Sequence, residues 1–593
     1  MSKKKTADET PSQIDDNGPS SDDKNSSLAT AIIIRNDQLE SQRSPFMSQW
    51  ERLGKLVMPR KSYILTTSYT PTMDREIQLF TSCAVQANQT LAAGCMAYIT
   101  PTDSRWFSFE PPEQIKDQPE VAEYFARLTE IAAQQLARSN FYTTIHELYL
   151  DRGCFGTTVM HCEPGDTDDT PLLFRTYDVG TFCIAENHER LVDTVFVKYK
   201  MTVRALVMQF GIGNVSGSVR AKYYAKNGTG LDEEMEIIHA MYPREKKDRV
   251  KGKMDGPNKA FASIYVEVAA KHLLRNGGYD EKPFFATRFL NWEKHVYGYS
   301  PSWTCFADIN QLNFLERMLD TLIEKIVDPP VLAPDTMVGQ IDARAGGLTV
   351  YNSSDPNAKP EFWLAAGNYS EGVARVEKKE NNVEEAFYVP MFKQFQADES
   401  KAGYPTAEEV RARQAEQLTN FSPTFTRLTT ELLTPLLIRL AGILQRLGMG
   451  PEIPQALIQN DGRGGESYVP EPKIAFNSRV ALAVKNMEVQ ATDATLKRAL
   501  NIIEVTQDTS VLDILDTDKI LKQGALSDGV DPDYLRSDAQ VAQIRQQRAQ
   551  AAAQQAQMQQ QAHVADMAHK TGNIKPDSPT GQAMLKQQQQ GAG

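Results

Sequence analysis

The chain has 593 residues, 41% of them apolar, enough to build several ordinary domains or one large elongated subunit. Its formal net charge of −12 argues against a protein that grips nucleic acid over a broad basic surface, because phosphate binding needs clustered Lys and Arg side chains. The sequence shows neither a signal peptide nor an uninterrupted apolar run near the ~20 residues of a membrane-spanning helix. We therefore expect no membrane partner.

The first half of the chain predicts an α+β arrangement. Residues 1–28 are rich in Lys, Asp and Ser with almost no large apolar side chains, which predicts a disordered tail. Apolar periodicity then predicts four helices and one strand, with the helices at about 41–56, 77–96, 119–139 and 140–152 and the strand at 103–109. From there to about residue 290, short β-rich runs alternate with Gly, Asp and Asn turns.

The second half is predicted to be mainly helical. Between residues 306 and 327, leucines and isoleucines recur at a three-four spacing that gives a helix one apolar face. Pro329 and Pro330 end this helix, because proline removes a backbone donor and restricts the residue before it. A segment with a strand candidate at 347–351 follows, and a second helix runs from about Ser370 to Pro390.

The remaining elements form a longer series. A polar loop at 393–405 precedes a capping box, Thr406-Ala-Glu-Glu409, which opens a long apolar helix. We predict kinks in this helix at Pro423 and Pro435. Shorter helices are expected at about 482–506 and 511–523. The Gln/Ala-rich end has too few large apolar residues for a core, so we expect it to be helical only where neighbouring subunits pack against it.

No catalytic or cofactor motif stands out. The glycine-rich stretch that begins at Asp461 lacks the lysine and the strand-to-helix setting of a phosphate-binding loop. Cys154, His161 and Cys162 lie close in sequence, but a zinc site needs a second pair of ligands, which this segment lacks. We therefore expect no enzyme activity, no cofactor and no metal, and we expect the six cysteines to be free thiols in a reducing compartment.

Several motifs in a fixed order resemble the portal proteins, or head-to-tail connectors, of short-tailed bacteriophages. These motifs are specific in combination, and they include Tyr297-Gly-Tyr-Ser-Pro301, which precedes the helix at 306–327, and Asp151-Arg-Gly-Cys-Phe-Gly156. The exit Val331-Leu-Ala-Pro334 and the capped helix start at Thr406 follow in the family's order. The resemblance spans about residues 30–540.

The resemblance implies a portal-type fold that is α+β and mainly helical, with a wing, a two-helix stem, a small clip, a long kinked helix and a helical crown. The implied boundaries are a disordered tail (1–28), the first part of the wing (29–300), stem helix 1 (301–328), the clip (329–368), stem helix 2 (369–391), the tunnel loop (392–405), the long kinked wing helix (406–447), the helical crown (448–545) and a Gln/Ala-rich barrel or disordered tail (546–593).

The resemblance also implies a function. The chain would form a homo-oligomeric ring, commonly a homododecamer, at the portal vertex of the virion, after assembly in the host cytoplasm. Double-stranded DNA would pass through its channel during packaging and ejection. Its protein partners would be the major capsid protein, the scaffold, the large terminase, which binds transiently, and the tail adaptor or nozzle proteins. The alternatives are a non-conducting oligomeric scaffold or adaptor of a virus particle, and an enzyme with dispersed catalytic residues.

A DNA channel should not hold phosphates tightly, because strong contacts would oppose movement. Acidic walls with sparse lysines meet this need through weak, salt-screened interactions. We therefore expect DNA contacts at Lys393 and Lys401 in the tunnel loop, and at Lys378 and Lys379 on the second stem helix. The alternative interpretation of all four is ordinary solvent-exposed charge.

Overall fold

The structure is a computed structural model. It describes residues 21–61, 79–112, 118–167, 170–225, 228–245, 255–292, 294–327, 369–393, 421–460, 471–477, 495–499, 516–527 and 538–572, and shorter pieces at 64, 115, 247, 249, 253, 331–332, 361–362, 467–468, 501–502 and 536. The chain divides into two compact units, Met1–Val484 and Lys485–Gly593.

Two antiparallel sheets form the β part of the first unit. The three-stranded sheet has the order β3-β2-β9, and the five-stranded sheet has the order β4-β5-β6-β7-β8. The strands are β2 (Thr157–Thr167), β3 (Thr170–Tyr177), β4 (Phe182–Glu186), β5 (Val192–Thr202), β6 (Glu234–Pro243), β7 (Phe261–Glu267), β8 (His272–Tyr279) and β9 (Phe284–Arg288). Strands β4 to β8 are sequential neighbours, whereas β9 returns to pair with β2, with Thr157 opposite Arg288.

Helices cover both faces of the five-stranded sheet. On one face, α1 (Ser21–Val57) packs Ala29, Ile32 and Leu39 against apolar side chains of the sheet. On the other face, α5 (Val203–Phe210) and α6 (Gly217–Tyr223) cover the alternate residues of the same strands, because successive side chains of a strand point to opposite faces. Helix α1 begins within the predicted disordered tail.

The main core lies among α2 (Cys83–Tyr98), α3 (Pro119–Arg138), α4 (Phe141–Phe155), α12 (Thr434–Arg446) and the three-stranded sheet. The helices predicted at 119–139 and 140–152 are confirmed as α3 and α4. Strand β1 (Phe107–Glu110) pairs with β14 (Lys473–Phe476), so the early part of the chain is tied to the end of the first unit.

The helix predicted around Pro423 and Pro435 is continuous from Phe421 to Arg446, and a π-helical turn occupies Thr429–Leu433. Proline cannot donate to the preceding turn, and the wider π turn immediately before Pro435 absorbs this loss. By length and composition this helix could cross a membrane, but most of its apolar window is buried within the protein, as in a core helix.

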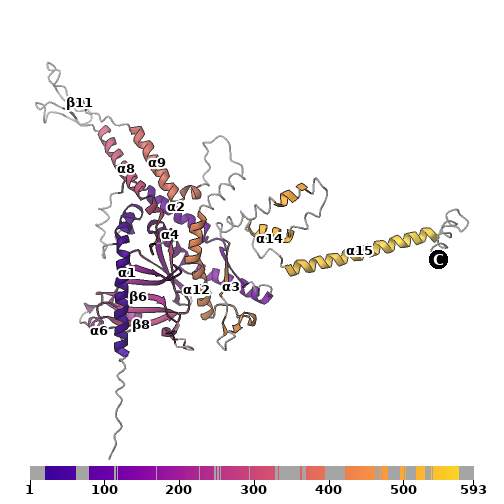
Figure 1. Ribbon diagram of the computed structural model, residues 1–593, viewed down its shortest axis with the longest axis horizontal. Coiled ribbons are helices and arrows are strands. Elements are labelled where there is room, and N and C mark those ends of the chain that lie inside the picture. Colours follow the sequence, from indigo (N-terminus) through magenta and orange to yellow (C-terminus); the bar gives the residue numbers. More distant parts are fainter. Residues whose placement is uncertain are drawn as a thin grey trace, which may run out of the picture. The chain divides into compact units, whose positions relative to one another are not determined.

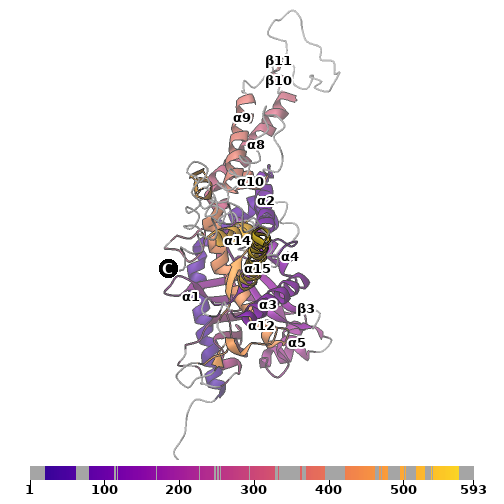
Figure 2. The same cartoon turned by 90° about the vertical axis from the view of Figure 1, so that its right-hand side faces the viewer.

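A helical hairpin extends from the body of the first unit (Figures 1 and 2). It consists of α8 (Phe306–Val327) and α9 (Tyr369–Ala386), with the short helices α7 (Pro301–Thr304) and α10 (Val389–Lys393) at its base. At its far end, β10 (Val331–Leu332) pairs with β11 (Glu361–Phe362). Both helices confirm the sequence prediction, while the strand candidate at 347–351 lies outside the described residues.

The described part of the second unit contains α14 (Thr517–Ser527) and α15 (Asp538–Gly572). A two-armed ion pair joins them, with Arg545 Nη1 and Nη2 at 2.5 and 2.7 Å from the carboxylate oxygens of Asp518. The Gln/Ala-rich segment is thus helical through residue 572. The helix predicted at 482–506 lies largely outside the described residues.

Candidate functional site

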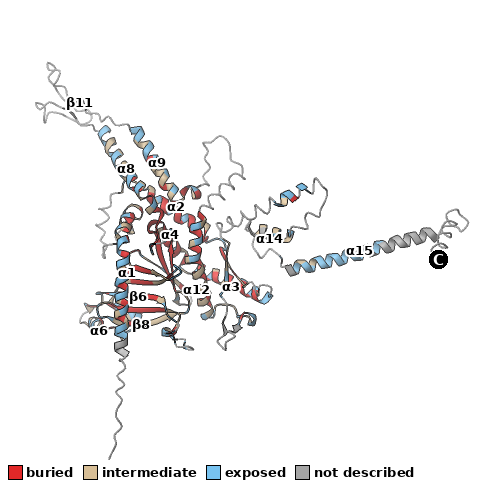
Figure 3. Cartoon of the chain, viewed as in Figure 1, coloured by how far each residue is buried: buried red, intermediate tan, exposed pale blue. Residues whose placement is uncertain are grey.

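The two helices of the α8–α9 hairpin approach each other closely. Ile309 and Leu312 of α8 and Val376 and Val383 of α9 are buried between the helices and the body. A Cβ atom on Gly372 would lie 2.8 Å from Leu319 Cδ2, so a side chain there would push the helices apart. The hairpin is buried at its base and exposed toward its far end (Figure 3).

The outward surfaces of the two helices differ in chemistry. On α8 five large apolar side chains, Phe314, Met318, Ile323, Ile326 and Val327, are at least 40% exposed, among exposed polar and charged residues such as Gln311, Arg317 and Glu324. On α9 the exposed side chains are mostly charged or polar, namely Glu371, Arg375, Glu377, Lys378, Asn381 and Glu385. An apolar surface of this kind on a soluble subunit usually marks a contact with another protein.

The base of the hairpin is fixed by hydrogen bonds to the end of α4. Ser300 Oγ accepts from the Trp303 amide at 3.0 Å, which caps α7, and it donates to the Cys154 carbonyl at 2.7 Å. Ser302 Oγ donates to the Gly153 carbonyl at 2.9 Å. All three serine contacts are buried or partly buried, so the hairpin starts from a rigid position.

Two glycines allow this close approach. Gly156 ends α4 with φ +85°, and a Cβ there would lie 2.6 Å from the Tyr299 carbonyl carbon. A Cβ on Gly298 would lie 2.8 Å from the Gly156 carbonyl oxygen. Only glycine fits at either position. The two motifs that carry the family resemblance, around Gly156 and around Gly298, thus pack directly on each other.

Arg152, within the first of these motifs, is fully buried and links three segments. Its Nη2 donates to the carbonyls of Arg288 at 3.1 Å and Thr424 at 3.2 Å, and its guanidinium lies 4.8 Å from the centre of the Phe289 ring. Burial lowers the pKa of this guanidinium. Asp151, beside it, forms an ion pair with Lys61 at 3.1 Å, yet burial raises the pKa of its carboxyl to about 6 despite that partner.

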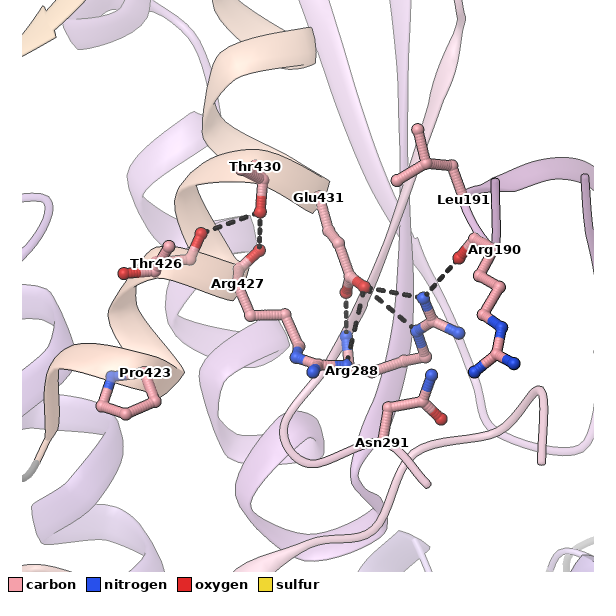
Figure 4. A pocket seen from close by; sticks show the side chains of 9 residues that line it. All are labelled: Arg190, Leu191, Arg288, Asn291, Pro423, Thr426, Arg427, Thr430 and Glu431. Atoms are coloured by element: carbon pink, nitrogen blue, oxygen red, sulfur yellow. Dashed lines mark hydrogen bonds and ion pairs between the residues drawn. The ribbon is translucent and has the colours of Figure 1, made fainter. Parts of the chain in front are cut away.

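A pocket of about 470 Å³ lies beside the π-helical turn (Figure 4). Within it, Glu431 accepts from the backbone amide of Arg288 at 2.8 Å and from its Nη2 at 2.7 Å. Arg288 also pairs with Glu186, and these carboxylates hold the pKa of its guanidinium above the ordinary value although burial opposes them. Glu431, which lines the pocket, therefore forms a buried ion pair that joins the π-helical turn to β9.

Two buried histidines meet where the two sheets adjoin. The rings of His161 and His239 are 5.7 Å apart, and His239 stacks on Tyr265 at 3.9 Å. Burial, together with the positive charges of Arg439 and Arg175, lowers the pKa of His161 to about 3. Both rings are thus neutral packing groups at neutral pH. Among the residues that the structure describes, no three His, Cys, Asp or Glu side chains come together as metal ligands.

The four predicted DNA-contact lysines fall in different settings. Lys379 Nζ lies 2.6 Å from Asp308 Oδ1, so it forms an ion pair across the hairpin. Lys378 is exposed on α9. Lys393 ends α10, and its side chain is outside the described part of the chain, as is the whole of Lys401.

Sequence reasoning did not identify Asp308 as the partner of Lys379. Opposite charges on two predicted neighbouring helices were visible in the sequence. Their pairing, however, depends on how the helices are rotated against each other, which periodicity alone does not determine.

The comparisons with known proteins agree with this architecture. A sequence model of the family described as "Bacteriophage head to tail connecting protein" matches residues 29–535. The chain belongs to this family. The portal protein of Salmonella phage epsilon15 is 28% identical over 518 residues, which cover 86% of this chain and 89% of that protein. The probable portal protein of Bordetella phage BPP-1 is 26% identical over 548 residues, which cover 92% and 95%.

Solved structures of gene transfer agent particles are also similar; the neck of the empty particle aligns at 11% identity with a TM-score of 0.34, over 72% of this chain and 90% of that one.

Family membership confirms the resemblance seen in the sequence. The function is that of a phage portal, a ring at one vertex of the capsid, and the roles as DNA channel and docking platform are general to the family. The mixed helix and sheet content confirms the predicted α+β fold class. Portal proteins are structural connectors, and the chain's relatives are components of the virion.

Proposed function

We propose that this portal is a passive conduit for double-stranded DNA, with the outward face of α9 lining its channel. The observation that carries the proposal is a contrast between the two helices of the hairpin: the exposed side chains of α9 are mostly charged or polar, whereas α8 also exposes large apolar side chains such as Phe314, Met318 and Ile326. A water-filled channel needs the polar face, whereas the apolar face of α8 gains stability where protein covers it.

The balance of charge on α9 fits sliding rather than gripping. The helix carries five Glu residues against one Arg and two Lys, a net charge of −2. Of the two lysines, Lys379 is neutralised by Asp308, which leaves Lys378 as a cation that could touch a phosphate. A few weak cationic contacts in an acidic wall keep DNA from binding tightly, because salt screens them over about 10 Å.

The same proposal assigns roles to the clip, the tunnel loop and the body of the subunit. Residues 329–368 form the clip, which docks the large terminase and later the tail proteins, and residues 392–405 form the tunnel loop. Lys393 and Lys401 in that loop contact DNA with Lys378. The body binds the major capsid protein and the scaffold during assembly in the host cytoplasm. The ring is a homododecamer and has no catalytic activity, so a separate motor hydrolyses ATP.

Charge reversal tests the conduit in a packaging reaction with assembled particles. Lys378→Glu, Lys393→Glu and Lys401→Glu, made together, should shorten the packaged DNA or release it early, while rings form as in the unaltered protein. The matched control is Lys55→Glu on the surface of α1, which should package normally. Full-length, retained DNA in the triple variant would remove the channel assignment.

A further inference from the structure

The α8–α9 hairpin carries opposite charges along its two edges. Successive helix residues are turned by about 100°, so the buried pair Val376 and Val383 marks the line of α9 that faces α8. Relative to that line, Arg375 and Lys379 fall on one side of the helix, and Glu377 and Glu380 fall on the other.

Side-chain contacts fix which residues of α8 share each edge. The ion pair between Lys379 and Asp308, at 2.6 Å, places Asp308 on the basic side of the hairpin. Glu316 lies on the other side, where it is close enough to Glu380 for the two carboxylates to repel each other, and Asp320, one turn further along α8, also repels Glu316. The hairpin thus has an acidic edge of Glu316, Asp320 and Glu380 and a basic edge that presents Arg375.

Among the residues that the structure describes, no ion pair neutralises the acidic edge within its own subunit. Burial raises the pKa of Glu316, and the negative charges of Glu380 and Asp320 raise it further. Asp320 is exposed and Glu316 and Glu380 are half-buried. On the opposite edge Arg375 is exposed, and Leu322 and Met318 of α8 lie on the same side, Met318 with 45% exposure.

We propose that in the ring the acidic edge of each hairpin, Glu316, Asp320 and Glu380, docks against Arg375 on the basic edge of the next copy. A ring uses a head-to-tail interface, in which one edge of a subunit meets the opposite edge of its neighbour. Opposite charges on the two edges meet this requirement at every interface. This inference rests on the ring assembly of the proposed function and assigns its contact residues.

The levels of the residues along the hairpin match this pairing. The rotation that relates neighbouring copies leaves the position of every residue along the ring axis unchanged. A side chain at an interface therefore meets residues of the next copy that lie at a similar position along this axis. Arg375 lies one residue from Val376, in the middle of α9, and Glu380 lies little more than one turn further along the helix. The long Arg side chain can span that difference.

Charge-reversal variants of the full-length chain test the interface. Arg375→Glu places a carboxylate opposite the acidic edge at every interface, and Glu380→Arg places a cation opposite Arg375 there, so we expect each variant to lower the fraction of chains in rings at least about tenfold. An equimolar mixture of the two variants should restore rings to within about twofold of the unaltered chain, because alternating subunits bring opposite charges together again. Sedimentation velocity and negative-stain electron microscopy measure both results.

The same experiment includes controls for loss of folding. Glu380→Arg removes a repulsive charge from its own hairpin, so its thermal unfolding should not be weakened, and Arg138→Glu on the exposed end of α3 should form normal rings. Rings from either single variant at the unaltered level, or a mixture that stays unassembled, would overturn the interface and leave the portal assignment intact. Failure of the unaltered chain to form any ring would overturn the proposed function itself.

Discussion

Ser300 Oγ donates a 2.7 Å hydrogen bond to the carbonyl of Cys154, so the residue that caps the first turn of the hairpin's base also closes the end of α4. Residues 146 positions apart in the chain are thereby locked together in the interior. The α8–α9 hairpin is the part of the protein proposed to line the channel, and this bond fixes the point from which it projects.

Ser300→Ala should therefore destabilise the subunit by about 2 kcal/mol, because it removes a helix cap and leaves a buried carbonyl without its donor. Chemical unfolding followed by circular dichroism measures the change. Ser44→Ala, at an exposed position on α1, is the matched control and should change stability by less than about 0.5 kcal/mol. Equal effects of the two substitutions would contradict the role of Ser300.

Gly156→Ala should lower the free energy of unfolding by more than the positive φ at this position alone explains. Its φ of +85° disfavours any side chain, and the added Cβ would lie 2.6 Å from the backbone of Tyr299. We expect a loss of about 3 kcal/mol or more, against about 1 kcal/mol for Gly448→Ala, which has φ +70° but open space around it. Thermal unfolding of the two variants separates the cost of the positive φ from the cost of the contact with Tyr299. Similar losses of stability in both variants would mean that this contact is unimportant.

The buried pair of Arg288 and Glu431 should show strong coupling. Glu431→Ala leaves a buried guanidinium with Glu186 as its remaining carboxylate partner, and should cost about 3 kcal/mol. Removing both charges, in Arg288→Met with Glu431→Ala, should cost clearly less than the sum of the single changes. Additive losses in urea unfolding would show that the ion pair does not act as a unit.

Stability should fall on acidification because of His161. Its pKa is about 3 in the folded protein and 6.5 ordinarily, so the unfolded chain binds more protons between these values. Folding stability is therefore lost progressively as the pH drops from 6.5 toward 3, by up to about 4 kcal/mol from this group. Asp151, with its raised pKa of about 6, acts in the opposite direction between its ordinary 3.8 and 6.

A comparison of two histidine variants shows how much of the pH dependence of stability comes from His161. His161→Gln should flatten the fall in stability between pH 6.5 and 4, whereas His188→Gln, at a side chain that is 88% exposed, should leave the pH profile unchanged. Urea unfolding at a series of pH values gives the comparison. Burial also lowers the pKa of His239, so part of the fall should remain in His161→Gln; a profile identical to that of the unaltered chain would contradict the role of His161.

Local patterns in the sequence predicted the helices well, and the contacts between distant segments poorly. The apolar spacing before Pro329 placed α8, because one face of that helix is dictated by residues within it. The pairing of Lys379 with Asp308 depends on how α9 is rotated against α8, across a segment of 71 residues, and no local pattern specifies that rotation. Lys379 was therefore predicted as a DNA contact, which its ion pair makes less favourable.

The same limit applies to the motifs that carried the family resemblance. The sequence around Gly156 and the sequence around Gly298 were each noticed separately. In the structure each of the two glycines packs against the backbone of the other motif. This contact depends on the pairing of β2 with β9, which brings Thr157 opposite Arg288. The π-helical turn before Pro435 was predicted only as a kink, because proline signals a disturbed helix but not the form it takes.

Electron cryomicroscopy of the purified ring would show which surface of the α8–α9 hairpin lines the portal channel. We expect an open axial channel wide enough for duplex DNA, with Lys378 and Glu385 of α9 facing the axis and Phe314 and Met318 of α8 covered or turned away from it. A channel lined by Phe314 and Met318, or a particle without an axial opening, would contradict it.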